Sequence, residues 1–172
     1  MKLNLGCGEN HLEGYVNVDC DPALKPDQVW SFTEKFPLET EVCDEIIMYH
    51  VIEHVRKVYH ESIFAEAHRV LRTNGIFIIS FPEFWQCAQN WKENKKGLRD
   101  FWEATIYGRQ TSQFDFHVTP MDRISVSSML VDAGFEILYC GPEPVEDYNS
   151  VVKARKLKPY LYQDAMRETL KG

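Results

Sequence analysis

The sequence predicts an open α/β fold built on a mostly parallel sheet. Four short apolar runs, each bounded by turn residues, are typical of strands buried on both faces: KLNL, YVNVD, DEIIMYHVI and IFIISF. A segment with helical periodicity separates the last two runs, and a second such segment precedes a fifth strand, EILYCG. Units of strand, helix and strand imply right-handed crossovers and therefore an open sheet.

Each element follows from its local pattern. The first strand ends at Gly6 and the second at Asp19. The first helix is expected over residues 60–75, where Asn74-Gly75 is the stop signal and one apolar face carries Ile63, Phe64, Ala67, Val70 and Leu71. A second helix, RISVSSMLVDAGF, is expected to stop at Gly134 and to turn inward Met129, Leu130 and Ala133.

The 172 residues, of which 44% are apolar, are enough for one well-buried core and predict a single domain over residues 1–172. Residues 84–120 interrupt the alternation, because they hold many aromatic and charged residues without a clean period. We interpret them as an inserted lid or cap, partly helical around DFWEATIYG. The alternative is an ordinary surface excursion whose aromatic side chains pin it to the domain.

Charge and cysteine content exclude several partners. A net charge of −7 argues against a surface that neutralises phosphates, so no nucleic-acid partner is expected. Five scattered cysteines without a C-x-x-C pair suit reduced thiols and a cytoplasmic location. No signal peptide or apolar span is evident, so no membrane partner is expected. We interpret the basic residues Lys153, Arg155, Lys156 and Lys158 as a solvated charge run, although contact with an acidic partner is the alternative.

The sharpest chemical feature is the stretch LNLGCGENHLEGYVNVD, residues 3–19. In doubly wound sheets a ligand lies beyond the carboxyl ends of the strands, where the backbone after the first strand approaches it closely. Gly6 and Gly8 meet that need. Asp19 ends the second strand, where a carboxylate can accept hydrogen bonds from both ribose hydroxyls. The combination predicts an adenosine pocket, and a tight turn beside a solvated aspartate is the alternative.

Residues 2–82 resemble the nucleotide-binding half of class I S-adenosylmethionine-dependent methyltransferases, through LNLGCG, NVD, IEHV and RVLRTNG. The resemblance continues more faintly through YGRQTSQFDFH and LVDAGFEIL. It implies a Rossmann-like sheet of seven strands with an antiparallel last strand, and S-adenosylmethionine as cofactor, with S-adenosylhomocysteine as product. The cofactor-binding residues that it implies are Leu5, Gly6, Cys7, Gly8, Asp19, Cys20, Phe32, Tyr49, His50 and Val51.

Three departures from the family pattern change the expected site. Asn4 stands where most such enzymes carry an acid. Only 13 positions separate Gly6 from Asp19, so the first helix must be very short or absent. Ser31 and Phe32 stand where an acid or amide usually holds the adenine amino group, so adenine is expected to rely on apolar stacking and backbone hydrogen bonds.

A sulfonium methyl group is already activated, so the protein mainly aligns the acceptor, excludes water and removes a proton where one must leave. The candidate catalytic residues are His54 and His117, with Asp115 placed to orient an imidazole. The structural alternative for each histidine is a surface or satisfied structural residue.

The spacing H-x-x-E-H of His50, Glu53 and His54 also occurs in zinc peptidases, where both histidines share a helical face. Here the approach to His50 reads as a strand, and continued extension would place the histidines about 13 Å apart, too far for one ion. No metal is therefore expected. A helix beginning at His50 would restore the zinc hydrolase, with a third ligand from Glu136 or Glu143.

The sequence as a whole predicts a small methyltransferase, monomeric or homodimeric, that uses S-adenosylmethionine. Its acceptor is expected to be a small molecule, for instance a sugar-like metabolite. The alternative is a catalytically silent module that binds S-adenosylmethionine or serves as an adaptor, and the zinc hydrolase is the further rival.

Overall fold

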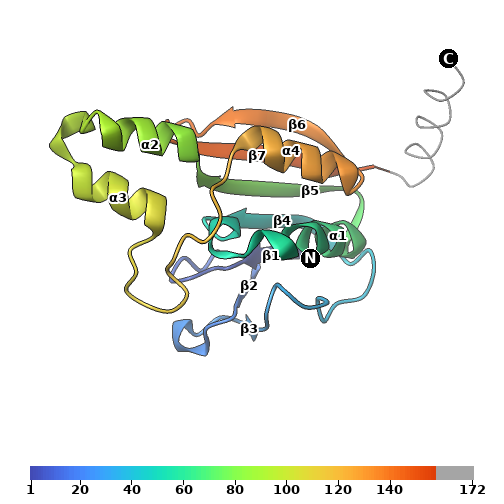
Figure 1. Ribbon diagram of the computed structural model, residues 1–172. Coiled ribbons are helices and arrows are strands. Elements are labelled where there is room, and N and C mark those ends of the chain that lie inside the picture. Colours follow the sequence, from blue (N-terminus) through green and yellow to red (C-terminus); the bar gives the residue numbers. More distant parts are fainter. Residues whose placement is uncertain (158–172) are drawn as a thin grey trace, which may run out of the picture.

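The computed structural model describes residues 1–157 and contains a seven-stranded sheet in the order β3-β2-β1-β4-β5-β7-β6 (Figure 1). The strands are β1 (Lys2–Leu5), β2 (Val16–Asp19), β3 (Gln28–Val29), β4 (Cys43–Tyr49), β5 (Leu71–Pro82), β6 (Phe135–Pro142) and β7 (Asn149–Lys156). Strands β1 to β5 pair in parallel, and β7 is antiparallel to both β5 and β6. The predicted fold, including the antiparallel last strand, is confirmed.

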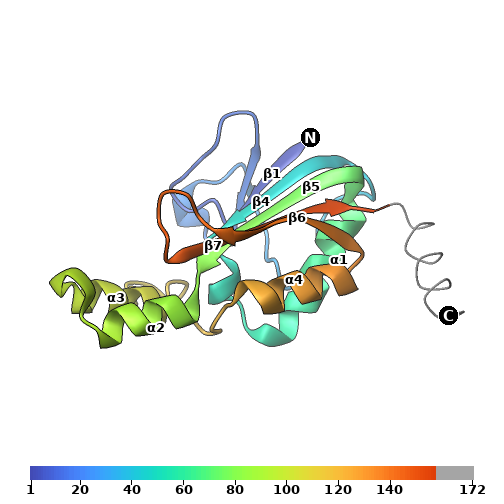
Figure 2. The ribbon, with the colours of Figure 1, turned by 90° about the horizontal axis from the view of Figure 1, so that it is seen from above.

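The helices lie on one side of this sheet (Figure 2). They are α1 (His60–Val70), α2 (Phe84–Lys92), α3 (Arg99–Tyr107) and α4 (Arg123–Asp132). The apolar faces of α1 and α4 cover the sheet, and Phe64, Val126 and Leu130 are fully buried against it. Asp122 caps α4 by accepting from the Ser125 backbone N–H at 2.9 Å, which satisfies one of the free amides of the first turn. The core therefore lies between α1, α4 and the inner residues of the strands.

The opposite face of the sheet carries no α-helix in the part of the chain that the structure describes (Figure 2). The expectation of strands buried on both faces is therefore wrong for this face. One row across it pairs charged and apolar residues of five neighbouring strands, namely Lys2, Glu45, Ile76, Arg155 and Glu136. The Lys2 ammonium donates to the Glu45 carboxylate at 3.1 Å, and Arg155 donates to Glu136 at 3.0 Å. Such cross-strand pairs suit a face that meets water.

No helix forms between β1 and β2, as the short spacing predicts. A polar network holds the loop of residues 6–15 instead. Buried Asn4 donates through Nδ2 to the Asn10 carbonyl and to Asn17 Oδ1, both at 2.9 Å. Asn17 Oδ1 also accepts from the Leu12 N–H at 2.8 Å. An acid at position 4 would face these oxygens without a proton to donate, so the network explains the amide there.

Two predicted boundaries are wrong. Helix α1 ends at Val70, and Leu71 to Gly75 begin β5 instead of completing the helix. Strand β4 ends at Tyr49, because His50 takes a positive φ of 56° and residues Ile52–His54 form a turn of 3₁₀ helix. Backbone reversals of this kind at a non-glycine residue leave no clear trace in hydrophobic periodicity.

The interpretation of the basic residues near the end of β7 as a solvated run is also wrong for Lys156. Its side chain is 4% exposed, and its ammonium donates to the Leu71 carbonyl at 2.7 Å and to Glu41 at 3.2 Å. These bonds fasten the end of β7 to the start of β5. Lys158 lies outside the described residues.

Residues 84–120 contain α2 and α3, which lie beyond the carboxyl end of β5 (Figure 1). The helix expected around DFWEATIYG corresponds to α3. Buried Trp102 anchors it by donating from its indole N–H to the Lys95 carbonyl at 3.0 Å, and its ring lies edge to face against Tyr148, with centroids 5.2 Å apart. Within residues 1–157, every helix is too short or too polar to cross a membrane.

The polar network also predicts a pH dependence of stability. Asp27 Oδ2 accepts from the Asn17 backbone N–H at 2.8 Å and from Asn17 Nδ2 at 3.0 Å, and these bonds hold the pKa of Asp27 below its usual range. A depressed pKa in the folded state gives stability that is present above the unfolded pKa of about 3.9 and is lost as the pH falls further. Asp27→Asn should therefore lower the free energy of unfolding in urea at pH 7, and its deficit relative to wild type should close below about pH 4.

The matched control is Asp132→Asn, which changes an exposed carboxylate at the end of α4. Its effect on the free energy of unfolding at pH 7 should be small, because this side chain is exposed. A deficit of Asp27→Asn that stays constant from pH 7 to pH 3 would contradict the role assigned to this carboxylate.

Candidate functional site

Three segments meet at the carboxyl ends of the central strands: the turn after β1, the end of β2 and the turn after β4. The first turn is left-handed at both glycines, with φ of +69° at Gly6 and +54° at Gly8. The Gly6 and Cys7 amides donate to the Val18 carbonyl of β2 at 2.8 and 3.0 Å. These bonds hold the turn against the end of the neighbouring strand.

Gly6 is required by a close contact within the protein. A Cβ added at Gly6 would lie 2.2 Å from Cγ2 of Val51, the buried residue that follows His50. A Cβ at Gly8, by contrast, would meet nothing within 4 Å. The two glycines therefore have different roles: Gly6 joins the turn after β1 to the turn after β4, whereas Gly8 borders open space.

Asp19 ends β2 with 7% of its surface exposed. Its Oδ2 accepts from the Gly8 amide at 2.9 Å and its Oδ1 accepts from the Asp21 amide at 3.0 Å. Each carboxylate oxygen can accept a further hydrogen bond. Asp19 therefore orders the glycine turn and still has acceptor capacity toward a ligand.

The two cysteines of this region are poor nucleophiles at neutral pH. Burial, helped by the nearby Asp19 carboxylate, raises the pKa of the Cys7 thiol to about 11. The same two causes raise the pKa of Cys20 above its usual range. Both side chains are therefore neutral thiols, and their contribution is one of shape.

Leu5 and Phe32 are placed differently from the other expected cofactor residues. Leu5 is fully buried and Phe32 is 7% exposed, and both side chains belong to the core. The Phe32 ring contacts Trp30 edge to face, with centroids 5.7 Å apart. The structure therefore gives Phe32 a core-packing role, with little ring surface for stacking on adenine.

The turn after β4 brings Tyr49 and His50 to the surface at the same edge of the sheet. Tyr49 is 40% exposed, and the His50 amide donates to the Ser80 carbonyl of β5 at 2.9 Å. Because the chain turns at His50 and coils through Ile52–His54, the assumption of continued extension past His50 is wrong. The argument that separated the histidines by their spacing along a strand therefore fails.

Glu53 was considered in the sequence analysis only as part of the alternative zinc hydrolase and was not among the predicted site residues. It is 2% exposed, and neither carboxylate oxygen has a hydrogen-bond partner among the described residues. His50 Nδ1 lies 3.5 Å from Glu53 Oε1, a contact too long for a well-formed hydrogen bond. A buried carboxylate without a hydrogen bond is costly, which is a signal of function that only burial could have revealed.

His54 and His117 lie beside Glu53, although 63 positions separate them in the sequence. Their rings are edge to face with centroids 4.7 Å apart, and one ligand atom from each of Glu53, His54 and His117 lies within 4.8 Å of the others. The structure thus unites two of the three predicted catalytic residues. The third, Asp115, accepts from the Thr111 hydroxyl at 2.7 Å and makes no hydrogen bond to an imidazole.

Two imidazoles near Glu53, those of His50 and His117, respond to it differently. Burial alone would lower the pKa of His50, but the Glu53 carboxylate raises it above its usual range. Burial lowers the pKa of His117, and the attraction of Glu53 offsets only part of that effect. At neutral pH His117 is therefore an uncharged imidazole with a lone pair available.

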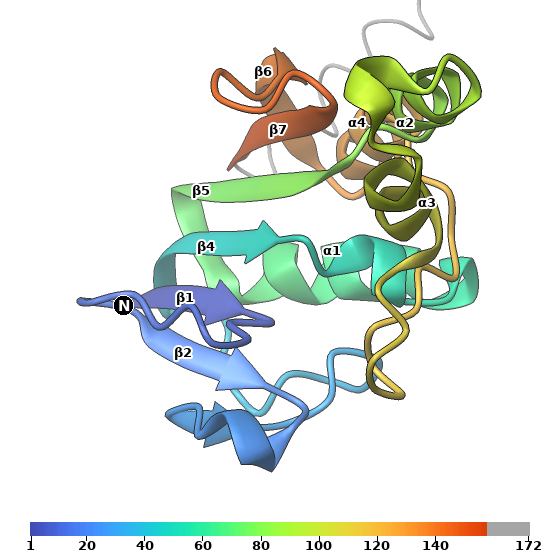
Figure 3. The same ribbon diagram turned by 90° about the vertical axis from the view of Figure 1, so that its left-hand side faces the viewer.

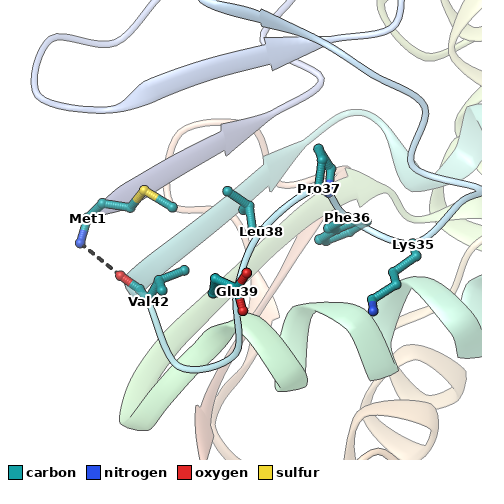
Figure 4. A pocket seen from close by; sticks show the side chains of 7 residues that line it. All are labelled: Met1, Lys35, Phe36, Pro37, Leu38, Glu39 and Val42. Atoms are coloured by element: carbon teal, nitrogen blue, oxygen red, sulfur yellow. Dashed lines mark hydrogen bonds between the residues drawn. The ribbon is translucent and has the colours of Figure 1, made fainter.

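The two further acids considered as metal ligands do not complete this cluster. Glu136 pairs with Arg155 on β7, and Glu143 accepts from Asn149 Nδ2 at 3.1 Å. A cavity of about 630 Å³ also lies elsewhere, at the amino ends of β1 and β4, and is lined by Met1, Val42 and residues 35–39 (Figure 4). It holds none of the predicted site residues.

Comparisons with known proteins agree with this fold. A family model described as a methyltransferase domain matches residues 3–79. A search of curated proteins finds no match. A solved S-adenosylmethionine-dependent methyltransferase from Methanosarcina mazei is 15% identical with a TM-score of 0.62, over 91% of this chain and 92% of that one.

Two other solved structures are similar. A S-adenosylmethionine-dependent methyltransferase from Archaeoglobus fulgidus is 12% identical with a TM-score of 0.64, over 90% of this chain and 85% of that one. A protein from Thermotoga maritima, described as a possible histamine N-methyltransferase, is 15% identical with a TM-score of 0.62, over 90% and 81%. At these identities the structures establish the fold. The resemblance of the chain to class I S-adenosylmethionine-dependent methyltransferases is confirmed.

The contact between Gly6 and Val51 can be tested by a double-mutant cycle. Gly6→Ala combines a strained positive φ with an overpacked contact and should lower the free energy of unfolding by about 3 to 5 kcal/mol. Gly8→Ala, which is strained but meets open space, should cost about 1 to 2 kcal/mol. Urea denaturation of Gly6→Ala, Val51→Ala and the double variant measures the coupling.

The double variant should lose less stability than the two single variants together, because Val51→Ala removes the methyl groups that clash with the new Cβ. Strict additivity would mean that the two turns are not joined by this contact.

Proposed function

We propose that this protein transfers the methyl group of S-adenosylmethionine to a small-molecule acceptor. One observation carries the proposal: the glycine turn, Asp19 and the turn at Tyr49–Val51 converge at the carboxyl edge of a sheet with the methyltransferase strand order. Open α/β sheets bind ligands at that edge. The family model that matches residues 3–79 spans all three segments.

The residues present suit this cofactor. Open space beside Gly8 leaves room for the amino-acid part of the ligand next to the turn amides. The remaining acceptor positions of Asp19 suit the ribose hydroxyls. The exposed ring of Tyr49 suits a sulfonium by cation-π attraction. When bound, S-adenosylmethionine supplies a methyl group already activated by the positive sulfur.

We assign the acceptor to the part of this edge where His54 and His117 lie, next to the turn after β4. The acidic net charge disfavours a nucleic-acid acceptor, and the described residues include no second recognition domain. The structural neighbour described as a possible histamine N-methyltransferase gives a small-molecule precedent on the same fold. Where the acceptor must lose a proton, we assign its removal to His117 or His54, whose rings lie 4.7 Å apart by their centroids.

Calorimetry with S-adenosylmethionine and S-adenosylhomocysteine tests the cofactor assignment. Wild type should bind both, and Asp19→Ala should weaken binding at least tenfold, because hydrogen bonds to a charged acceptor contribute about 1.5 to 3 kcal/mol each. A thermal melt of the variant checks that loss of the bonds to Gly8 and Asp21 leaves the chain folded.

The matched control is Asp21→Ala, which removes a neighbouring carboxylate that accepts from the Ala23 amide at 2.9 Å. Its affinity should stay within about twofold of wild type. The assignment fails if wild type binds neither compound, or if both variants bind them as tightly as wild type does.

We further propose that residues 84–120 act as a cap over the acceptor side of this site, within a single domain. The chain after α3 leaves the helices and returns toward α4 along this end of the sheet (Figure 3). Its last part is held at the site, because the Val118 and Thr119 amides donate to the Glu53 carbonyl at 2.9 and 3.2 Å. The segment also exposes large apolar side chains, among them Trp85, Tyr107, Phe114 and Phe116. Exposed aromatic side chains concentrated in one segment of the sequence are available for contact with a ligand or partner.

Limited trypsin digestion tests the cap. Cleavage after Lys95, Lys96 and Arg99 should slow when S-adenosylhomocysteine is bound, because a cap closed over the site opens less often to the protease. Peptide mapping by mass spectrometry measures each cut. Asp19→Ala should show no such protection at the same ligand concentration, and identical digestion of free and bound wild type would count against the cap.

A further inference from the structure

Glu53, His54 and His117 form a cluster of groups with the chemistry of a metal site. One carboxylate and two imidazoles are the ligand set of catalytic zinc centres that keep an open position, and the same set holds other divalent transition ions. One ligand atom from each residue lies within 4.8 Å of the others. Glu53 is buried, whereas His54 and His117 are half-buried, so the cluster is partly accessible to solvent.

The buried carboxylate points independently to a cation. Glu53 is 2% exposed, and both of its oxygens lack a hydrogen bond. A void of about 10 Å³, space for about one water molecule or one ion, lies beside it; Glu53, His117, Thr105 and Thr119 line it, and His54 does not. The nearest cationic partner of Glu53 is a long contact, with His50 Nδ1 at 3.5 Å, and coordination of a metal would stabilise such a carboxylate further.

The imidazoles are held in the manner of metal ligands. His54 Nδ1 donates to the Phe116 carbonyl at 3.1 Å, so the lone pair of Nε2 is free to bind a cation. A backbone carbonyl on the second ring nitrogen is the usual outer partner of a ligating histidine. The Val118 and Thr119 amides donate to the Glu53 carbonyl, and the Thr119 hydroxyl donates to the Val55 carbonyl at 2.9 Å. These bonds fix His117 beside the turn that carries Glu53 and His54.

We propose that Glu53, His54 and His117 bind one divalent transition-metal ion such as Zn²⁺, with an open coordination position toward the acceptor side of the site. Ligand atoms around a tetrahedral zinc lie about 3.3 Å apart, so the widest pair must close by up to about 1.5 Å. Small rotations of the half-exposed imidazoles provide this movement. His50, 3.5 Å from Glu53, borders the ion without being needed as a ligand.

The position of the ion gives it a role in the proposed methyl transfer, and this part of the inference rests on that proposal. A bound divalent ion lowers the pKa of a coordinated hydroxyl or thiol. The acceptor would then be a molecule that presents an oxygen or sulfur to the metal. With His54 and His117 held as ligands, the proton would leave to solvent instead of to either imidazole. The lone pair on that oxygen or sulfur would attack the methyl carbon while the bond from this carbon to the sulfonium sulfur breaks, and S-adenosylhomocysteine would leave with the electron pair of that bond.

Metal titration of the untagged protein tests the site without any cofactor. After removal of metal with a chelator, Zn²⁺ calorimetry should show one ion per chain, and Co²⁺ should give the intense visible absorption of a tetrahedral site. Glu53→Gln and His117→Gln should each weaken Zn²⁺ binding at least a hundredfold, because even outer-shell changes cost 10 to 100-fold. Addition of a small thiol should change the Co²⁺ spectrum if a coordination position is open.

The matched control is His11→Gln, which changes an exposed histidine outside the cluster that contacts the Leu24 carbonyl. This substitution should leave the Zn²⁺ affinity unchanged. Thermal melts of the metal-free variants separate loss of a ligand from loss of the fold. Substitution of half-buried His117 is expected to disturb the fold less than substitution of buried Glu53.

The proposed metal site is overturned if wild type binds no ion, or if the control weakens binding as much as the ligand variants do. An unchanged Co²⁺ spectrum with thiol would overturn the open position. Binding of S-adenosylhomocysteine by metal-free protein is measured separately, so the metal site and the cofactor assignment can fail independently.

Discussion

The close contact between Gly6 and Val51 determines the geometry of the whole carboxyl edge of the sheet. Because β1 and β4 are parallel neighbours, with Leu3 opposite Ile46, the turns that follow them leave the sheet at the same edge. The missing side chain at Gly6 lets Val51 pack directly on the backbone of the first turn. The chain after β4 is thereby drawn down onto the glycine turn. Tyr49 and His50 are left facing outward, and Glu53 is carried into the interior.

The absence of a first helix has consequences on both sides of the sheet. At the carboxyl edge it is replaced by the amide network of Asn4 and Asn17, which satisfies loop amides that a helix would have paired. On the open face it leaves parallel strands without the helical cover that such sheets normally have. The sequence accommodates this exposure because charged and apolar residues alternate along the strands. Lys2 and Glu45 lie on the open face, and the residues that follow them, Leu3 and Ile46, are fully buried. One missing helix therefore explains both the polar turn and the mixed composition of the outer face.

Periodicity and turn chemistry predicted the strands, the crossovers and the glycine turn, because these depend on local sequence. The extent of β4 was not predictable in this way, since His50 adopts a positive φ that tertiary contacts impose. Leu71 fitted the apolar stripe of a helix and instead begins a strand, because β5 pairs with β4 as far back as Cys43. The burial of Glu53 depends on contacts with the segment at Val118, and that of Lys156 depends on Leu71, both far away in the sequence. Neither burial therefore had a local sequence signal. The proximity of His54 to His117 was hidden for the same reason.

Two free-energy costs meet where residues 84–120 contact the site: the burial of the Glu53 carboxylate and the ordering of the chain around His117. An ionised carboxylate without hydrogen bonds costs several kcal/mol in a protein interior, and fixing the chain around His117 costs conformational entropy as well. The backbone hydrogen bonds from Val118 and Thr119 offset part of the conformational entropy cost. They do not offset the cost of burying the carboxylate, because they are made to the Glu53 carbonyl and leave both carboxylate oxygens without a hydrogen bond. A cation held between Glu53 and the two imidazoles would offset both, since it neutralises the carboxylate and gives the returning segment a further attachment. The same contact would then close the cap, position the acceptor and compensate the buried charge, which explains why three such groups converge here.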